Sequence, residues 1–247
     1  MRRRSTTVVL GLATLALTVL PGCSTSSSTP ATAASAPAGS AKPKTASDDA
    51  KPTNILTSAQ LRGRLLDEGD LGQGYTREPE QEFSHDDVTV IGCPALEQLG
   101  GDAATGGSFD FANKAEAAFT YEGSTDSEVG EELYSDTETK LCQGTGRIFD
   151  AMVSCPTYQI VAGSTPVKIT TQKLTAPALG DEQWSQLLTF TAGGQSSVFK
   201  QTAIRSGTLL VIISGPPGLV DTHIDKALTK AESSSWPPVH QRGPAAG

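Results

Sequence analysis

The chain has 247 residues, a formal net charge of −8 and 5% aromatic residues. The negative charge argues against nucleic acid as a partner, because binding nucleic acid needs a basic surface. With few aromatic residues, the core must rest mainly on Leu, Val, Ile and Ala. The length suits one domain with one core once the terminal segments are set aside.

The N-terminus combines three arginines, an uncharged apolar run over residues 6–20 and Leu-Pro-Gly-Cys at 20–23. A run of about 15 residues is shorter than the roughly 20 of a membrane span, and it fits the hydrophobic region of a secretory signal. The four residues at 20–23 resemble a bacterial lipobox, with Pro where Ala, Ser or Thr is usual. The resemblance implies a lipoprotein signal peptide at 1–22 and cleavage before Cys23. It also implies a diacylglyceryl group on Cys23, with acyl chains such as palmitate that hold the chain on the cell membrane.

Both ends of the mature chain are poor in large apolar residues. Residues 23–53 are dominated by Ser, Thr, Ala, Pro and Lys, and residues 234–247 by Ser, Pro, Gly and Ala. Such segments bury too little apolar surface to offset their ordering entropy. We therefore expect a disordered tether at 23–53, a folded domain at 54–233 and a disordered tail at 234–247.

The domain is expected to contain two or three helices. Thr57 and Gln60 form a capping-box pattern ahead of leucines at helical spacing. Pro94 favours the first turn of a second, short helix. Ser135 and Glu138 form another capping-box pattern before the longest helical stretch, which two glycines weaken by about 1 kcal/mol each relative to Ala, so that a kink is possible there. A last helix follows the final strand.

Alternating and β-branched residues predict strands separated by short Gly-containing connections, which favours an antiparallel meander. We therefore expect an α+β domain in which a single antiparallel sheet of five to seven strands is flanked by these helices. The expected strands lie at 107–121, which reads as one or two strands, and at 129–134, 158–161, 167–174, 186–191, 196–204 and 209–214.

Residues 78–138 contain 16 acidic residues against one basic residue. Two interpretations stay open. One is a face that binds cations or steers a partner, and the other, which we favour, is a solvated face of a secreted protein. We predict no metal site and no cofactor.

The common hydrolase and phosphate-binding motifs are absent from the sequence. It contains neither the Gly-x-Ser-x-Gly turn of many hydrolases nor a phosphate-binding glycine loop. His240 lies in the tail, while His85 and His223 have aspartates nearby. A His–Asp pair can orient a base, but no nucleophile is identified beside either histidine. We therefore expect both to be exposed polar residues, and we predict no catalytic residue and no enzyme activity.

The order of elements and several short runs resemble the PknH-like extracellular sensor domain, which occurs on actinobacterial receptor kinases and on free lipoproteins. The resemblance covers roughly residues 55–232 and implies an antiparallel sheet with flanking helices and a cleft for an extracellular ligand. It implies no catalytic residue. The runs are Leu-Leu-Asp-Glu-Gly-Asp-Leu-Gly-Gln-Gly-Tyr at 65–75, Gly-Cys-Pro-Ala-Leu at 92–96, Val-Ser-Cys-Pro-Thr-Tyr at 153–158, Leu-Gly-Asp at 179–181, and Gly207.

From this resemblance and the lipobox-like residues together we expect a membrane-anchored lipoprotein on the extracytoplasmic face, with a non-enzymatic ligand-binding or sensor-type domain. Its partners would be the membrane, through the lipid, and an unknown extracellular small molecule or protein. An exported lipid carrier or a cell-envelope enzyme is the alternative from another class. A carrier would need a large apolar cavity, and an enzyme would need a histidine within hydrogen-bond reach of a Ser or a carboxylate.

Disulfides persist in an exported domain. Cys142 and Cys155 lie 13 positions apart. On an unbroken helix that is roughly 20 Å, against a limit of about 7 Å between bridged Cα atoms, so this pair is disfavoured unless the glycines break the helix. Cys93 can reach either partner. Cys155 ends the helix and matches the family-like position, so we expect a Cys93–Cys155 disulfide with Cys142 left as a free thiol.

Overall fold

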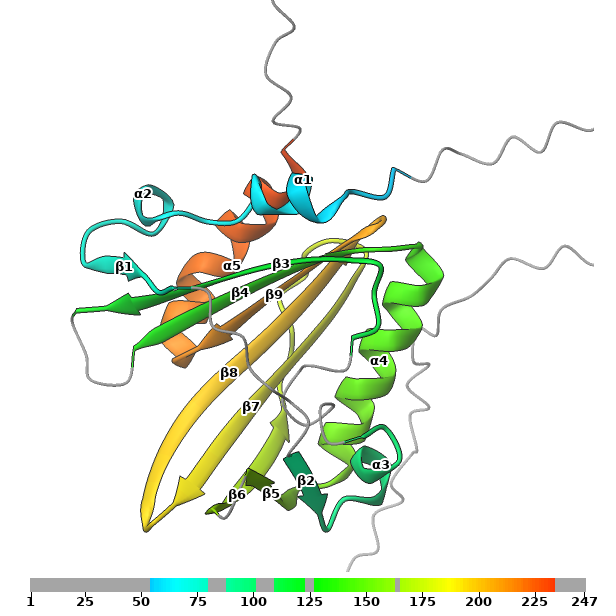
Figure 1. Cartoon of the computed structure of the whole chain (residues 1–247), viewed down its shortest axis with the longest axis vertical. Coiled ribbons are helices and arrows are strands. Elements are labelled where there is room, and N and C mark those ends of the chain that lie inside the picture. Colours follow the sequence, from blue (N-terminus) through cyan, green and yellow to red (C-terminus); the bar gives the residue numbers. More distant parts are fainter. Residues whose placement is uncertain (1–53, 80–87, 101–108, 123–126, 163–164, 234–247) are drawn as a thin grey trace, which may run out of the picture. The chain divides into compact units, whose positions relative to one another are not determined.

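The computed structural model describes residues 54–79, 88–100, 109–122, 127–162 and 165–233 (Figure 1). The expected signal peptide, tether and tail lie outside these residues. The strands are β1 Tyr75–Arg77, β2 Val88–Ile91, β3 Asn113–Tyr121, β4 Glu128–Ser135, β5 Thr157–Ala162, β6 Thr165–Lys173, β7 Glu182–Ala192, β8 Gln195–Ser206 and β9 Leu209–Gly215. The helices are α1 Ser58–Arg62, α2 Glu68–Leu71, α3 Pro94–Glu97, α4 Glu138–Ser154 and α5 Pro217–Glu232.

All nine strands form one antiparallel sheet in the order β1-β3-β4-β9-β8-β7-β6-β5-β2. The single antiparallel sheet of the predicted α+β class is therefore confirmed, but its size of five to seven strands is wrong. The two strands at the ends of the sheet, β1 and β2, have only three and four residues. Strands this short show too little alternation to be recognised in the sequence.

The predicted meander is confirmed over β5 to β9, where each strand pairs with the next. Gly193 and Gly194 join the two longest strands, β7 and β8, and both have positive φ angles, 58° and 82°. This conformation matches the twist of a tight hairpin and is one that glycine adopts without steric cost. The meander then extends through β9 to β4, which brings the two halves of the domain into one sheet.

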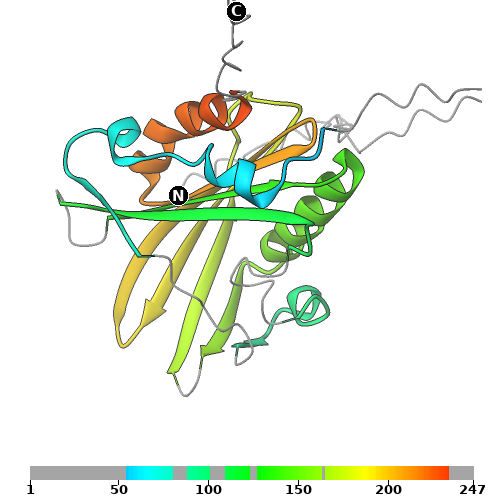
Figure 2. The same ribbon diagram turned by 45° about the horizontal axis from the view of Figure 1, so that its top comes forward.

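Helices lie against both faces of the sheet (Figures 1 and 2), and its centre is buried on both faces. In β9, Leu209, Val211 and Ile213 belong to the core that contains α5, whereas Leu210 and Ile212 belong to the core that contains α4. A strand covered on both faces needs apolar residues at every position, which explains the uninterrupted run in β9. The described unit is therefore layered, with α1, α2 and α5 against one face and α3 and α4 against the other.

The helix count and one cap differ from expectation. Five helices occur in the described residues rather than two or three, because α1, α2 and α3 are single turns of four or five residues. The capping box at Thr57 and Gln60 is confirmed. The box predicted at Ser135 is wrong, since Thr137 caps α4. The Ser135 hydroxyl instead donates to the Thr208 carbonyl and accepts from the Leu56 N–H.

Helix α4 runs without a break from Glu138 to Ser154. Gly144 has a packing role, because a Cβ atom at this position would lie 2.8 Å from the Phe111 ring. A Cβ atom on Gly146 would have more room, with its nearest neighbour, Trp184, at 3.8 Å. The kink considered for this helix does not occur.

Candidate functional site

Residues 64–74, which we call the cover segment, include all but the last residue of the 65–75 run. The segment includes α2 and lies over the sheet beside α5 (Figures 1 and 2). Leu65, Leu66 and Leu71 are buried in the same core as the apolar face of α5. The cover segment is thus anchored by leucines, and its polar residues are left at the junction with α5.

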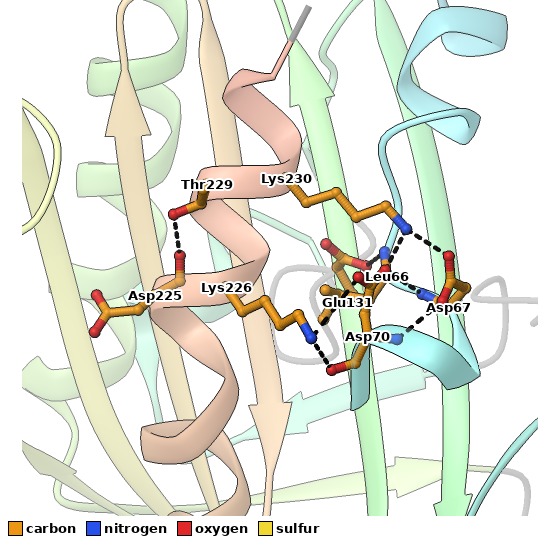
Figure 3. A network of polar contacts seen from close by, with 8 residues as sticks. All are labelled: Leu66, Asp67, Asp70, Glu131, Asp225, Lys226, Thr229 and Lys230. Carbon is orange, nitrogen blue, oxygen red and sulfur yellow. Dashed lines mark hydrogen bonds and ion pairs between the residues drawn. The ribbon is translucent and has the colours of Figure 1, made fainter. Parts of the chain in front are cut away.

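The aspartates of the cover segment build the short helix and then bind α5. Asp67 caps α2, and its carboxylate and that of Asp70 accept each other's backbone N–H groups at 2.9 and 3.1 Å. Lys230 of α5 pairs with Asp67 at 2.8 Å and also with Asp70 (Figure 3). Lys226 donates to the backbone carbonyl of Asp70. Two lysines one turn apart on α5 therefore bind the single turn of helix α2.

These contacts shift the titration of the paired groups. Hydrogen bonding to Lys230 holds the pKa of Asp67 below its usual range, aided by the Asp70 N–H. Burial lowers the pKa of Lys230, but hydrogen bonds to Asp67 and Asp70 outweigh burial and leave it raised. Both shifts favour the charged forms, so the ion pairs persist at neutral pH.

Glu131 lies beneath this junction, on the face of β4 that also carries Val129 and Leu133. Its side chain is 1% exposed. The Leu66 N–H donates to Oε2 at 2.6 Å, whereas Oε1 has no hydrogen-bond partner in the described part of the chain. Burial raises the pKa of Glu131 to about 7, against the opposing effect of the Leu66 hydrogen bond. This carboxyl group therefore titrates near neutrality.

An aromatic pair extends the site toward β1. The Tyr75 hydroxyl and His223 Nε2 are 2.7 Å apart, and the Tyr75 ring packs on Tyr121 with centroids 4.8 Å apart. His223 is 5% exposed, so the expectation of an exposed histidine is wrong. The side chain lies on the inner face of α5, one turn before Ala227. Burial lowers its pKa, as does Lys226, so His223 is neutral at pH 7.

A second polar cluster is structural. Arg205 is buried, and it donates to Glu182 at 2.7 Å and to the Gly207 carbonyl at 2.9 Å. Asp181 pairs with Arg205 at 3.2 Å and accepts from the Gly207 N–H. The Leu-Gly-Asp run thereby joins the start of β7 to the β8–β9 turn. Gly180 is required here, because its φ is +62° and a Cβ atom would lie 2.5 Å from the Arg205 carbonyl.

Of the two expectations for the cysteines, the Cys93–Cys155 disulfide is confirmed. Cys93 and Cys155 form a disulfide with Cα atoms 5.6 Å apart, which fastens the start of α3 to the end of α4. The free thiol expected at Cys142 is wrong, since no cysteine in the described residues is a free thiol. The Cys142 sulfur lies against β7, 3.2 Å from Glu182 Oε1.

The remaining predicted positions fall elsewhere. Cys23, His85 and His240 lie outside the described residues. Across the described ranges, no three His, Cys, Asp or Glu side chains are grouped so as to hold a metal ion. Within the same ranges, no helix is both long and apolar enough to cross a membrane.

Sequence reasoning missed Glu131, although a signal for it exists. Val129, Glu131 and Leu133 occupy alternate positions of one strand and so share one face. A carboxylate in an apolar register is a residue that the fold must either pair or neutralise. The 65–75 run resembles a known family, but nothing in that run predicts its contacts with α5, which join residues more than 150 positions apart.

No protein-family model and no curated protein matches this sequence. The fold is similar to the crystal structure of the extracellular domain of PknH from Mycobacterium tuberculosis, with a TM-score of 0.55. The two chains are 12% identical, and the match covers 72% of this chain and 98% of that one. At this level of identity, the similarity shows a shared fold.

Proposed function

We propose that this chain is a membrane-anchored extracytoplasmic lipoprotein whose folded part is a non-enzymatic ligand-binding or sensor-type domain. The observation that carries the proposal is the fold, which matches nearly the whole of an extracellular domain. An extracytoplasmic location also suits the Cys93–Cys155 disulfide, because such bonds persist in oxidising compartments.

The anchor in this proposal is a lipid on Cys23. The supporting observations are the apolar run before it and the lipobox-like residues 20–23. Two acyl chains hold a protein on a bilayer far more firmly than one, which binds only marginally. The polar residues 24–53 would then separate the domain from the membrane surface.

No catalytic role is assigned to His223 in this proposal. Its ring nitrogen bonds to a phenol, Tyr75, whereas a nucleophile-and-base pair would bring a histidine to a Ser, Thr or Cys. The charged side chains nearby, Lys226, Lys230 and Asp70, are engaged with one another. These pairs hold α5 against the cover segment.

The test is to identify what copurifies with the full chain in mild detergent. An organic extract of the purified protein is analysed by mass spectrometry. The melting temperature of the native protein is then compared with that of a sample that has been unfolded, washed free of ligand and refolded. We expect one enriched, chemically unchanged small molecule and a higher melting temperature for the native sample. Bound ligand at a hundredfold excess over its Kd stabilises by about 2.7 kcal/mol.

Other results would favour the alternatives. Long-chain lipid in equimolar amount would indicate an exported lipid carrier, and chemical conversion of the bound molecule would indicate a cell-envelope enzyme. The anchor is tested separately with Cys23→Ala, which should release the protein from membranes. Ser26→Ala, a nearby substitution in the same segment, should leave it bound.

A further inference from the structure

Glu131 is a buried acid, and only one of its two carboxyl oxygens is hydrogen-bonded within the described residues. One carboxyl oxygen accepts the Leu66 N–H at 2.6 Å, and the other has no partner in the described residues. The side chain is 1% exposed. A buried carboxylate without full hydrogen bonding is costly, so the closed structure favours the neutral acid.

The part of the chain that covers Glu131 is the short cover segment. The cover segment contains a single four-residue helix, α2. Its polar attachments to α5 are the contacts of Asp67 and Asp70 with Lys226 and Lys230 (Figure 3), and a hydrogen bond from Arg64 to the Ala231 carbonyl at 2.6 Å. Ion pairs that are partly exposed contribute little stability. The burial of Leu65, Leu66 and Leu71 therefore sets most of the cost of a local opening of this short segment, and the polar contacts add little to that cost.

The charges around Glu131 have both signs. Lys230 on α5 and Arg77 on β1 favour its ionised form, whereas Asp70 of the cover segment opposes it. His223, also on α5, is neutral at pH 7. The Coulomb effects of Lys230 and Asp70 on Glu131 act in opposite directions, and burial is the largest influence on its pKa. Access to water therefore decides the protonation state.

We propose that the cover segment is a proton-controlled latch, which is closed over β4 while Glu131 is protonated and opens when Glu131 is ionised. Opening lets water reach the unpartnered Oε1 atom and breaks the Leu66 hydrogen bond. It also exposes the leucines that the segment buries against α5. The inference goes beyond the proposed function and requires neither the lipid nor a ligand.

The expected size of the effect follows from linkage. The closed-state pKa of Glu131 is about 7, and its ordinary value is 4.5. If the open segment restores the ordinary value, the opening equilibrium increases about 25-fold between pH 5.5 and pH 8. Groups that titrate identically in both states contribute nothing to this change.

Amide hydrogen exchange of the full chain in detergent, read by mass spectrometry and corrected for the intrinsic pH dependence, measures this opening. Peptides covering 64–74 should lose protection as pH rises from 5.5 to 8, while peptides from α4 serve as the internal reference. In Glu131→Gln, which has no ionisable group at this position, protection of 64–74 should not change with pH. Glu128→Gln, on the exposed end of the same strand, should behave as the wild type.

The wild-type measurement requires no variant to fold. If protection of 64–74 in the wild type changes no more with pH than that of α4, the latch does not exist. An equal pH response in the wild type and Glu131→Gln would likewise overturn the proposal, because another group would then control the segment. Loss of the response in Glu131→Gln alone supports it.

Discussion

Replacing Glu131 with glutamine should change how the stability of the whole domain depends on pH. Glu131 is almost fully buried, and its pKa is raised to about 7 from an ordinary value of 4.5. The folded state therefore binds more protons than the unfolded state between these values. The stability that the neutral acid supplies is fully present below about pH 4.5 and is lost as the pH rises to about 7.

The magnitude follows from the same two values. A rise from 4.5 to about 7 corresponds to about 3 kcal/mol of folding free energy, an upper figure because local opening relieves part of it. The side-chain amide of the Glu131→Gln variant would keep an acceptor for the Leu66 N–H without a charge. We expect this variant to be close to wild type at pH 5 and more stable by about 2 kcal/mol at pH 8.

Urea unfolding at pH 5, 6, 7 and 8, followed by fluorescence, gives the free energy of unfolding of each chain. The difference between variant and wild type removes contributions from other groups. Among these is His223, whose lowered pKa makes stability increase with pH across its own titration. Glu128→Gln controls for loss of one negative charge. A constant difference between Glu131→Gln and wild type at all four pH values would refute the reasoning.

The other predictions concern the disulfide and the glycines of α4. Cys93→Ser should cost about 4 kcal/mol, because the bond closes a loop of 62 residues, and Cys155→Ser should cost the same in denaturant unfolding under non-reducing conditions. Gly146→Ala should stabilise by about 0.5–1 kcal/mol through helix propensity, since its Cβ has room. Gly144→Ala should instead destabilise, because its Cβ would meet the Phe111 ring at 2.8 Å; a gain in melting temperature would contradict this contact.

The parts of the fold that the sequence predicts are those with long, regular patterns. The strands from β5 to β9 have clear alternation or apolar runs and are joined by glycine turns, so their order along the chain is also their order in the sheet. The strands β1 and β2 are too short for a pattern, and their places at the sheet ends depend on pairing with distant strands β3 and β5. Local sequence carries no signal for such pairing.

The candidate site was less predictable for a related reason. The polarity of Asp67 and Asp70 suggests a solvated turn, and their partners on α5 are known only once the fold is formed. His223 lies among polar neighbours in the sequence, yet the helix turns it inward toward Tyr75. Glu131 is the exception, because its place between Val129 and Leu133 identifies a buried acid from alternation alone.

The central claim is that a lipid on Cys23 holds this domain at the extracytoplasmic face of the membrane. The most direct measurement is the mass of the N-terminal peptide of the full-length protein, expressed in a bacterium that makes lipoproteins and purified without reducing agent. The account predicts a mature chain that begins at Cys23 and carries a diacylglyceryl group on its sulfur. A chain that begins elsewhere, or one in which Cys23 carries a free thiol or a disulfide, would contradict it.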